Sequence, residues 1–244
     1  IQVPLLHTLN AEQEGALAFR QTHKNPLLFG DTGSGKTEIY IHLIAQTLQK
    51  AQSALFLMPE IALTPQIESR LKAVFGDMVG IWHSKVTQKQ KKQILQGLYE
   101  GSIRVIAGAR SALFLPIASL GLIIIDEEHD DAYKSQSSPR YNARDIALYL
   151  GQKSDVRVIL GSATPSAASY YHALKHKSMY RLKGRYFGSS KHIKILPPPS
   201  ALNTINSTQN RINEILGEEI ITKMATSLSQ KQQVIVFLPT RAHY

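Results

Sequence analysis

The sequence predicts an α/β protein built on a mostly parallel sheet with helices on both faces. Short runs rich in Leu, Ile and Val alternate with segments of helical length through the first two thirds of the chain. Such runs are typical of parallel strands, because both faces of a parallel sheet are buried. Strands are expected at 26–30, 53–58, 79–83, 103–108, 120–126 and 156–162, and helices at 36–50, 64–75, 87–100 and 142–152. Ligands of such sheets bind at the carboxyl ends of the strands.

The composition indicates a globular protein with a basic surface. Of the 244 residues 43% are apolar, and 28 Lys and Arg against 18 Asp and Glu give a net charge of +10. This excess favours a polyanionic partner such as nucleic acid, although a solvated basic surface explains it equally well. The absence of cysteine excludes disulfides and thiolate zinc sites from this chain. With no signal peptide and no apolar run near the roughly 18 residues of a membrane span, a cytoplasmic protein is expected.

A shift in composition indicates more than one domain. Residues 183–210 are rich in Gly, Pro, Ser and Asn, and an amphipathic segment at 212–230 and a strand-like run at 233–239 follow them. A lone helix and strand cannot bury a core of their own. We therefore expect a first domain over 1–185, a linker over 186–211 and the truncated start of a second domain over 212–244, in a fragment of a longer protein.

The segment GDTGSGKT at 30–37 is a phosphate-binding loop that follows a strand and opens a helix. Gly33 and Gly35 allow successive N–H groups to face one anion, and the helix N-terminus adds its dipole. Lys36 is expected to reach the β and γ phosphates of ATP, while the Thr37 hydroxyl binds Mg²⁺. The candidate nucleotide-binding residues of the loop are Gly30, Asp31, Thr32, Gly33, Ser34, Gly35, Lys36 and Thr37.

The acidic stretch LIIIDEEHDD at 122–131 follows a buried strand. Asp126 is expected to hold Mg²⁺ and to face Thr37 across adjacent strand ends, and Glu127 to orient and deprotonate the attacking water. The next acids, Glu128, Asp130 and Asp131, are interpreted as solvated or helix-capping carboxylates, because Mg²⁺ takes few protein ligands. His129 is either an interdomain contact or a plain polar residue.

These motifs, with further segments, resemble superfamily 2 DNA helicases, and among them the bacterial replication-restart helicases. The supporting segments are LNAEQ (9–13), PEIALTPQ (59–66), WHS (82–84), GARSALFLP (108–116), YKSQSSPRYNARDIA (133–147) and GSATPS (161–166). The resemblance implies a RecA-like lobe that uses ATP and Mg²⁺ for 3′ to 5′ unwinding of single-stranded and forked DNA. It also implies primosome and single-strand-binding proteins as partners, and a zinc-bearing insertion in a second lobe beyond this chain.

The resemblance assigns roles to particular residues. It implies adenine recognition by Gln13 and DNA backbone contacts by Thr64, Gln66 and Arg110. It also implies coupling of the nucleotide site to DNA by His129, Ser162 and Thr164. A loop after the acidic stretch interleaves aromatic and cationic residues, as proteins that hold single strands do. These candidates are Tyr133, Lys134, Arg140, Tyr141 and Arg144. Composition alone equally allows a loop whose tyrosines pack locally, and the resemblance favours DNA.

Other features leave alternatives open. The basic cluster at 85–92 is most simply an exposed helix face, whereas the basic and aromatic segment at 172–194 fits either a surface or a DNA role. A RecG-like translocase, a phosphate-loop ATPase acting on another substrate and a non-catalytic module are the rival functions. Because the chain ends before the second-lobe arginines of this class, it is expected to bind ATP and Mg²⁺ weakly and to turn over poorly alone.

Overall fold

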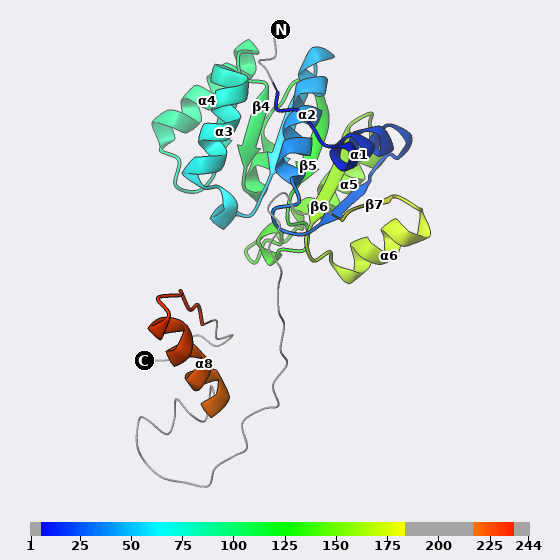
Figure 1. The fold of residues 1–244 in the computed structure, drawn as a ribbon. Coiled ribbons are helices and arrows are strands. Elements are labelled where there is room, and N and C mark those ends of the chain that lie inside the picture. Colours follow the sequence, from blue (N-terminus) through cyan, green and yellow to red (C-terminus); the bar gives the residue numbers. More distant parts are fainter. Residues whose placement is uncertain (1–5, 184–216, 237–244) are drawn as a thin grey trace. The chain divides into compact units, whose positions relative to one another are not determined.

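The computed structural model describes residues 6–183 and 217–236 of the chain (Figure 1). The chain divides into two compact units between Gly188 and Ser189, and each unit is described by itself. Within the described residues, no helix is both long enough and apolar enough to cross a bilayer.

The first unit contains a seven-stranded sheet in which every neighbouring pair of strands is parallel. The strand order is β3-β4-β2-β5-β6-β1-β7. The strands are β1 (Leu27–Gly30), β2 (Ser53–Leu57), β3 (Val79–Trp82), β4 (Val105–Gly108), β5 (Leu120–Ile125), β6 (Arg157–Ser162) and β7 (Met179–Leu182). All the strands expected from the sequence within this unit are confirmed, and β7 is an additional one at the edge.

Helices cover both faces of the sheet, as predicted. One face packs against α1 (Ala11–Thr22), α2 (Lys36–Gln49) and α3 (Pro65–Phe75). The other packs against α4 (Gln88–Glu100), α5 (Ala143–Lys153) and α6 (Ala167–Lys175). Neighbouring residues of β5 enter opposite cores, because successive side chains of a strand point to opposite faces. Ile124 therefore packs with the first set of helices and Ile125 with the second.

Several elements of the first unit are not among those expected from the sequence. Helix α1 begins with a capping box in which Asn10 and Gln13 cap each other's backbone N–H groups. The pattern N-x-x-Q is a usable start signal for this helix, because it satisfies two of the N–H groups that a helix leaves without partners. Helix α6 begins at the N-cap Ser166, and the short strand β7 is only partly buried, which weakens its apolar signal.

The second unit contains α8 (Glu218–Ser229), which lies within the amphipathic segment predicted at 212–230. The strand predicted at 233–239 is not observed where the structure describes it, since residues 233–236 form neither strand nor helix. A strand requires a neighbour for its backbone hydrogen bonds. The described part of this unit, 217–236, supplies no second strand. Residues 237–239 of the predicted strand and the whole linker lie outside the described residues.

Candidate nucleotide and DNA site

The phosphate loop joins the carboxyl end of β1 to the N-terminus of α2. Gly33 and Gly35 adopt left-handed φ angles of 81° and 87°, which side-chain-bearing residues rarely reach. A Cβ atom on Gly33 would point into open space, so the backbone conformation and not crowding favours glycine there. The N-cap Gly35 offers no side-chain acceptor to α2. The N–H groups of the first helical turn are therefore suited to an anion.

Lys36 lies folded against the loop. Its Nζ atom donates to the carbonyl oxygens of Gly30 at 2.6 Å and Asp31 at 3.3 Å. An ammonium group has three donors, so one remains for a phosphate oxygen. Asp31 and Thr32 are exposed, whereas the buried hydroxyl of Ser34 has no protein partner among the described residues.

Gln13 packs directly on the phosphate loop. Its Oε1 atom accepts from the Asn10 N–H at 2.9 Å, and its Nε2 atom donates to the Gly35 carbonyl at 3.3 Å. A Cβ on Gly35 would overlap this amide. One buried glutamine therefore holds the start of α1 against the loop.

Asp126 follows β5 and is held by two tyrosine hydroxyls. Tyr40 on α2 donates to its Oδ1 atom at 2.9 Å, and Tyr133 donates to its main-chain carbonyl at 2.5 Å. Burial raises the pKa of Asp126, and the Tyr40 hydrogen bond and the charge of Lys36 offset part of this effect. Burial also raises the pKa of Tyr40 well above its ordinary value, so this phenol remains a donor at neutral pH.

Asp126 was expected to face Thr37 across the ends of adjacent strands, and this expectation is wrong in one respect. Strands β1 and β5 are not neighbours, because β6 lies between them. Gly161 of β6 leaves the space through which Tyr40 reaches Asp126, since a Cβ there would overlap the tyrosine hydroxyl and lie 3.2 Å from Oδ1. Thr37, three residues before Tyr40, lies on the same side of α2.

Asp126 and Thr37 carry oxygen groups of the kind that suit a magnesium ion. Mg²⁺ prefers hard oxygen ligands and is usually bound by one or two carboxylates together with substrate phosphates. Asp126 supplies a carboxylate whose pKa is raised by burial, so a nearby cation would offset the cost of its charge. Thr37 would add a hydroxyl oxygen from the first turn of α2.

Glu127 lies just beyond β5 in a left-handed conformation, with φ of 47°. Its side chain is 31% exposed, and its Oε2 atom lies 3.6 Å from Nδ1 of His129. Asp130 donates its N–H to the Glu127 carbonyl at 2.9 Å and caps η4 (Asp131–Tyr133) with its carboxylate. Glu127 thus presents a partly exposed carboxylate directly after Asp126 in the chain.

The three candidate coupling residues form one hydrogen-bonded group. His129 Nδ1 lies 2.9 Å from the Ser162 hydroxyl, and its Nε2 lies 3.3 Å from the Thr164 hydroxyl. The Thr164 N–H also donates to the Ser162 hydroxyl at 2.9 Å. The structure therefore connects the acidic stretch 126–131, here called the acidic box, to the GSATPS segment within the first unit. Of the two interpretations of His129, this contact favours a polar residue inside the lobe over an interdomain contact.

The interpretation of Glu128 as a solvated carboxylate is wrong. Its side chain has no exposed surface, so it is not a solvated carboxylate. Its Oε2 atom pairs with Nη1 of Arg144 at 3.0 Å, and Arg144 also pairs with Asp145. The Arg144 side chain is only 17% exposed, and its guanidinium serves this internal network instead of facing solvent as a DNA contact.

The tyrosine-bearing loop is only partly available to DNA. Tyr133 is 1% exposed and belongs to the core, so it cannot stack on a base as predicted. Tyr141 is half-buried against Phe114, with ring centroids 5.0 Å apart. Lys134 and Arg140 are exposed. The exposed cationic members of the loop therefore fit a phosphate contact better than its tyrosines fit stacking.

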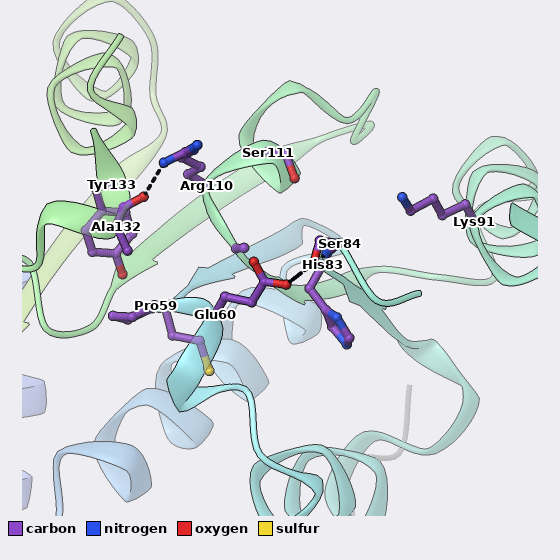
Figure 2. Close-up of a pocket in the computed structure, with 11 residues that line it drawn as sticks. Pro59, Glu60, His83, Ser84, Lys91, Arg110, Ser111, Ala132 and Tyr133 are labelled. Carbon is purple, nitrogen blue, oxygen red and sulfur yellow. Dashed lines mark hydrogen bonds between the residues drawn. The ribbon is translucent and has the colours of Figure 1, made fainter. Parts of the chain in front are cut away.

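A pocket lies beside this loop at the carboxyl ends of β2, β3 and β4 (Figure 2). Arg110 borders it and donates to the main-chain oxygens of Ala132 and Lys134, at 3.0 and 2.9 Å, so it also fastens the loop. Glu60 and Ser84 also line the pocket, and Glu60 accepts hydrogen bonds from the N–H and the hydroxyl of Ser84. The lining residues of the pocket are Met58, Pro59, Glu60, His83, Ser84, Lys91, Ala109, Arg110, Ser111, Ala132 and Tyr133.

The pocket includes a residue that the sequence pattern places on a plain exposed helix face. Lys91 belongs to the basic cluster at 85–92, and its ammonium lies 5.5 Å from the ring centre of Trp82. Helical spacing is the signal that separates Lys91 from its exposed neighbour Lys89: Lys91 lies three residues before the buried Ile94 and seven before the buried Leu98, on the core-facing side of α4. On the far side of Glu60, Thr64 caps α3 and is exposed together with Gln66.

Comparisons with known proteins show which family the chain resembles. The profile of the family "DEAD/DEAH box helicase" matches residues 10–172. Replication restart protein PriA of Helicobacter pylori is 50% identical over 241 residues, which cover 99% of this chain and 36% of that protein. Replication restart protein PriA of Bacillus subtilis is 35% identical, over 98% of this chain and 28% of that protein. The chain thus spans about a third or less of the length of these relatives.

Solved structures share the fold at low identity. RecG bound to a three-way DNA junction has a TM-score of 0.55 and 22% identity, over 93% of this chain and 31% of that one. The helicase MrfA bound to DNA and AMPPNP has a TM-score of 0.56 and 18% identity, over 89% of this chain and 32% of that one. At this identity the likeness establishes a helicase-type RecA-like fold for the chain.

Proposed function

The chain belongs to the DEAD/DEAH box helicase family, and we propose that it is the ATP-binding lobe of a replication-restart DNA helicase that moves 3′ to 5′. The observation that carries the proposal is the contact of Asp126 with Tyr40 on the helix that begins at Lys36, because it brings the acidic box to the phosphate loop. The high identity to proteins named replication restart protein PriA supports the same assignment.

The residues of the nucleotide site divide the chemistry of ATP hydrolysis. The loop N–H groups and Lys36 would hold the phosphates, and Thr37 and Asp126 would hold Mg²⁺, which neutralises charge on the phosphates when bound. Glu127 would orient the attacking water and accept its proton. Gln13 would recognise adenine through its remaining amide hydrogen.

The DNA path we propose crosses the carboxyl ends of β2, β3 and β4. Exposed Thr64 and Gln66 lie at the start of α3, soon after the lining residue Glu60 in the chain. Exposed Lys134 and Arg140 belong to the loop that follows the lining residues Ala132 and Tyr133. Hydroxyls, helix N-termini and lysines bind phosphates without reading bases, which suits a motor that moves over any sequence. His129, Ser162 and Thr164 would connect this path to the nucleotide site.

Family resemblance suggests how the rest of the protein is organised. Residues 1–185 would form the first helicase lobe, 186–211 a linker and 212–244 the start of the second lobe. The second lobe would supply the arginines that complete hydrolysis, and a zinc-bearing insertion. The chain alone would then hydrolyse ATP poorly. Single-stranded and forked DNA, primosome proteins and single-strand-binding proteins would be its partners in the bacterial cytoplasm.

The test uses the full-length protein with forked DNA, measuring ATP hydrolysis and strand separation. Lys36→Ala is expected to abolish both activities, and Glu127→Gln to lower hydrolysis by about 10² to 10⁴ while ATP binding persists. Lys89→Ala, on the exposed face of α4, is the matched control and should leave both unchanged.

ATP hydrolysis that DNA does not stimulate would instead favour a phosphate-loop ATPase acting on another substrate. Regression of model forks without 3′ to 5′ unwinding would favour a RecG-like translocase.

A further inference from the structure

The Glu128 carboxylate is fully enclosed yet has no part in the nucleotide chemistry proposed above. Its Oε1 atom accepts from the Ser166 N–H at 2.7 Å. Its Oε2 atom accepts from Arg144 at 3.0 Å, from the Ser169 hydroxyl at 2.7 Å and from the Ser166 hydroxyl at 3.1 Å. A buried charge with this many donors is held in one place, because losing any donor leaves part of its charge uncompensated.

One side of this network is the start of α6. Ser166 is the N-cap of α6 and accepts from the Ser169 N–H at 3.3 Å. A carboxylate at a helix N-terminus is stabilised by the helix dipole and by the free N–H groups there. Glu128 therefore anchors α6, and with it the preceding segment 161–166 that carries Ser162 and Thr164.

The other side is the base of the tyrosine-bearing loop. Lys134 and Asn142 form an antiparallel bridge, and the Ser135 N–H donates to the Tyr141 carbonyl at 2.7 Å, so the loop is closed at its base. Asn142 is also the N-cap of α5 and accepts from the Arg144 N–H at 3.0 Å. A shift of the loop base is thus passed to Arg144 within the first turn of α5.

Glu128 is joined by one peptide bond to Glu127, and its own N–H donates to the Gly161 carbonyl at 3.1 Å. The side chain and the main chain of Glu128 are therefore both fixed to neighbouring segments. The left-handed conformation of Glu127 depends on this fixed neighbour, since a non-glycine residue at φ of 47° needs surrounding contacts to persist.

From these contacts we propose that Glu128 and Arg144 are positioning residues whose buried ion pair transmits the position of the DNA-facing loop 133–142 to Glu127 and to segment 161–166. This proposal rests on the proposed function, since it concerns the DNA-stimulated ATPase of that helicase. Phosphate contact at the exposed Lys134 or Arg140 would shift the loop base, and the ion pair would carry that shift to the hydrolytic carboxylate.

The experiment measures ATP hydrolysis by the full-length protein with and without single-stranded DNA. Glu128→Gln and Arg144→Gln are expected to lower the DNA-stimulated kcat by about tenfold, while the basal rate and the KM for ATP change by less than about threefold. The matched control is Asp145→Asn. Asp145 also pairs with Arg144, but its side chain is 61% exposed and lies outside the buried network, so stimulation should persist.

The double variant Glu128→Gln/Arg144→Gln separates a shared path from two independent defects. It is expected to lose no more stimulation than either single variant, because both changes break the same ion pair. Losses that multiply in the double variant, or stimulation within about twofold of wild type in both single variants, would overturn the proposal. Thermal unfolding of each variant verifies that the fold is retained.

A further variant keeps the test decisive if the charge variants do not fold. Ser169→Ala removes one donor from Glu128 and retains the ion pair, and a roughly threefold loss of stimulation is expected. Unchanged stimulation in this variant would then count against the proposal. The Lys36→Ala variant, measured in parallel, reports on the proposed function separately: if it retains DNA-stimulated hydrolysis the proposed function fails, whatever Glu128 does.

Discussion

The hydroxyl of Tyr40 donates to Oδ1 of Asp126 at 2.9 Å, joining α2 to the end of β5 across 86 residues of sequence. The hydrogen bond passes Gly161 on β6, which lies between the strands that carry the phosphate loop and the acidic box. The position of the proposed magnesium carboxylate therefore depends on a tyrosine and a glycine that take no part in the chemistry.

Tyr40→Phe is expected to weaken magnesium-dependent hydrolysis. The change removes the hydroxyl donor to Asp126 and preserves the buried ring, so the carboxylate loses its orientation and the core keeps its packing. Removing such a supporting hydrogen bond typically costs about tenfold or more in metal affinity or activity. Titrating Mg²⁺ against the ATPase rate of the full-length protein measures the effect, and Tyr149→Phe, at a side chain 58% exposed, is the control. An unchanged Mg²⁺ midpoint would contradict the supporting role.

Gly161→Ala is expected to be more damaging than Tyr40→Phe. The added methyl group would overlap the Tyr40 hydroxyl and lie 3.2 Å from Asp126 Oδ1, so the buried tyrosine ring has to move. Overpacking of this kind costs about 1–3 kcal/mol in stability. Thermal unfolding should show a lower Tm, and the Mg²⁺ midpoint should rise above that of Tyr40→Phe. Gly101→Ala is the comparison variant, because nothing lies within 4 Å of the added Cβ atom. Its φ of 74° strains any side chain, so this variant reports the cost of backbone strain without overlap.

Tyr133 requires two variants, because it is a core residue and a hydrogen-bond donor. Tyr133→Ala should destabilise the lobe by about 3–5 kcal/mol, since it empties a fully buried aromatic site. Tyr133→Phe should keep the packing and lose only the bond to the Asp126 carbonyl, for about 0.5–1.5 kcal/mol. Chemical denaturation measures both free energies of unfolding. Tyr99→Ala, at a side chain 90% exposed, should change stability by no more than about 0.5 kcal/mol.

Lys134→Ala and Arg140→Ala are expected to weaken DNA binding without sequence preference. Both side chains are exposed on the loop, and removing one phosphate-binding cation should reduce the magnitude of the slope of log affinity against log salt by about one. Fluorescence anisotropy with single-stranded DNA at several salt concentrations measures this slope. Lys89→Ala on α4 removes the same type of charge away from the pocket and should leave the slope unchanged. Equal slopes for all three variants and the wild type would place the DNA elsewhere.

Local patterns are enough to predict much of the fold and the nucleotide site. The apolar runs predict the parallel strands, and GDTGSGKT predicts the loop that the structure shows at the end of β1. Gly33, Gly35, Lys36 and Thr37 are neighbours in the chain, so their geometry follows from a strand, a turn and a helix start. The group of His129, Ser162 and Thr164 follows from family resemblance, and the structure brings these residues together.

The structure differs from the sequence-based expectation at residues whose contacts are made with segments distant in the chain. In the sequence, Glu128 resembles any other acid in DEEHDD, and Tyr133 and Arg144 resemble exposed members of a basic, aromatic loop. Only the packing of α5 and α6 against the sheet buries Tyr133 and joins Glu128 to Arg144, because burial and charge pairing depend on which segments meet. The sequence by itself determined the six strands β1 to β6, the phosphate loop and the acidic stretch that follows β5. The tertiary structure decided which charges face solvent, that β6 separates β1 from β5, and that Gly161 leaves room for Tyr40 to hold Asp126.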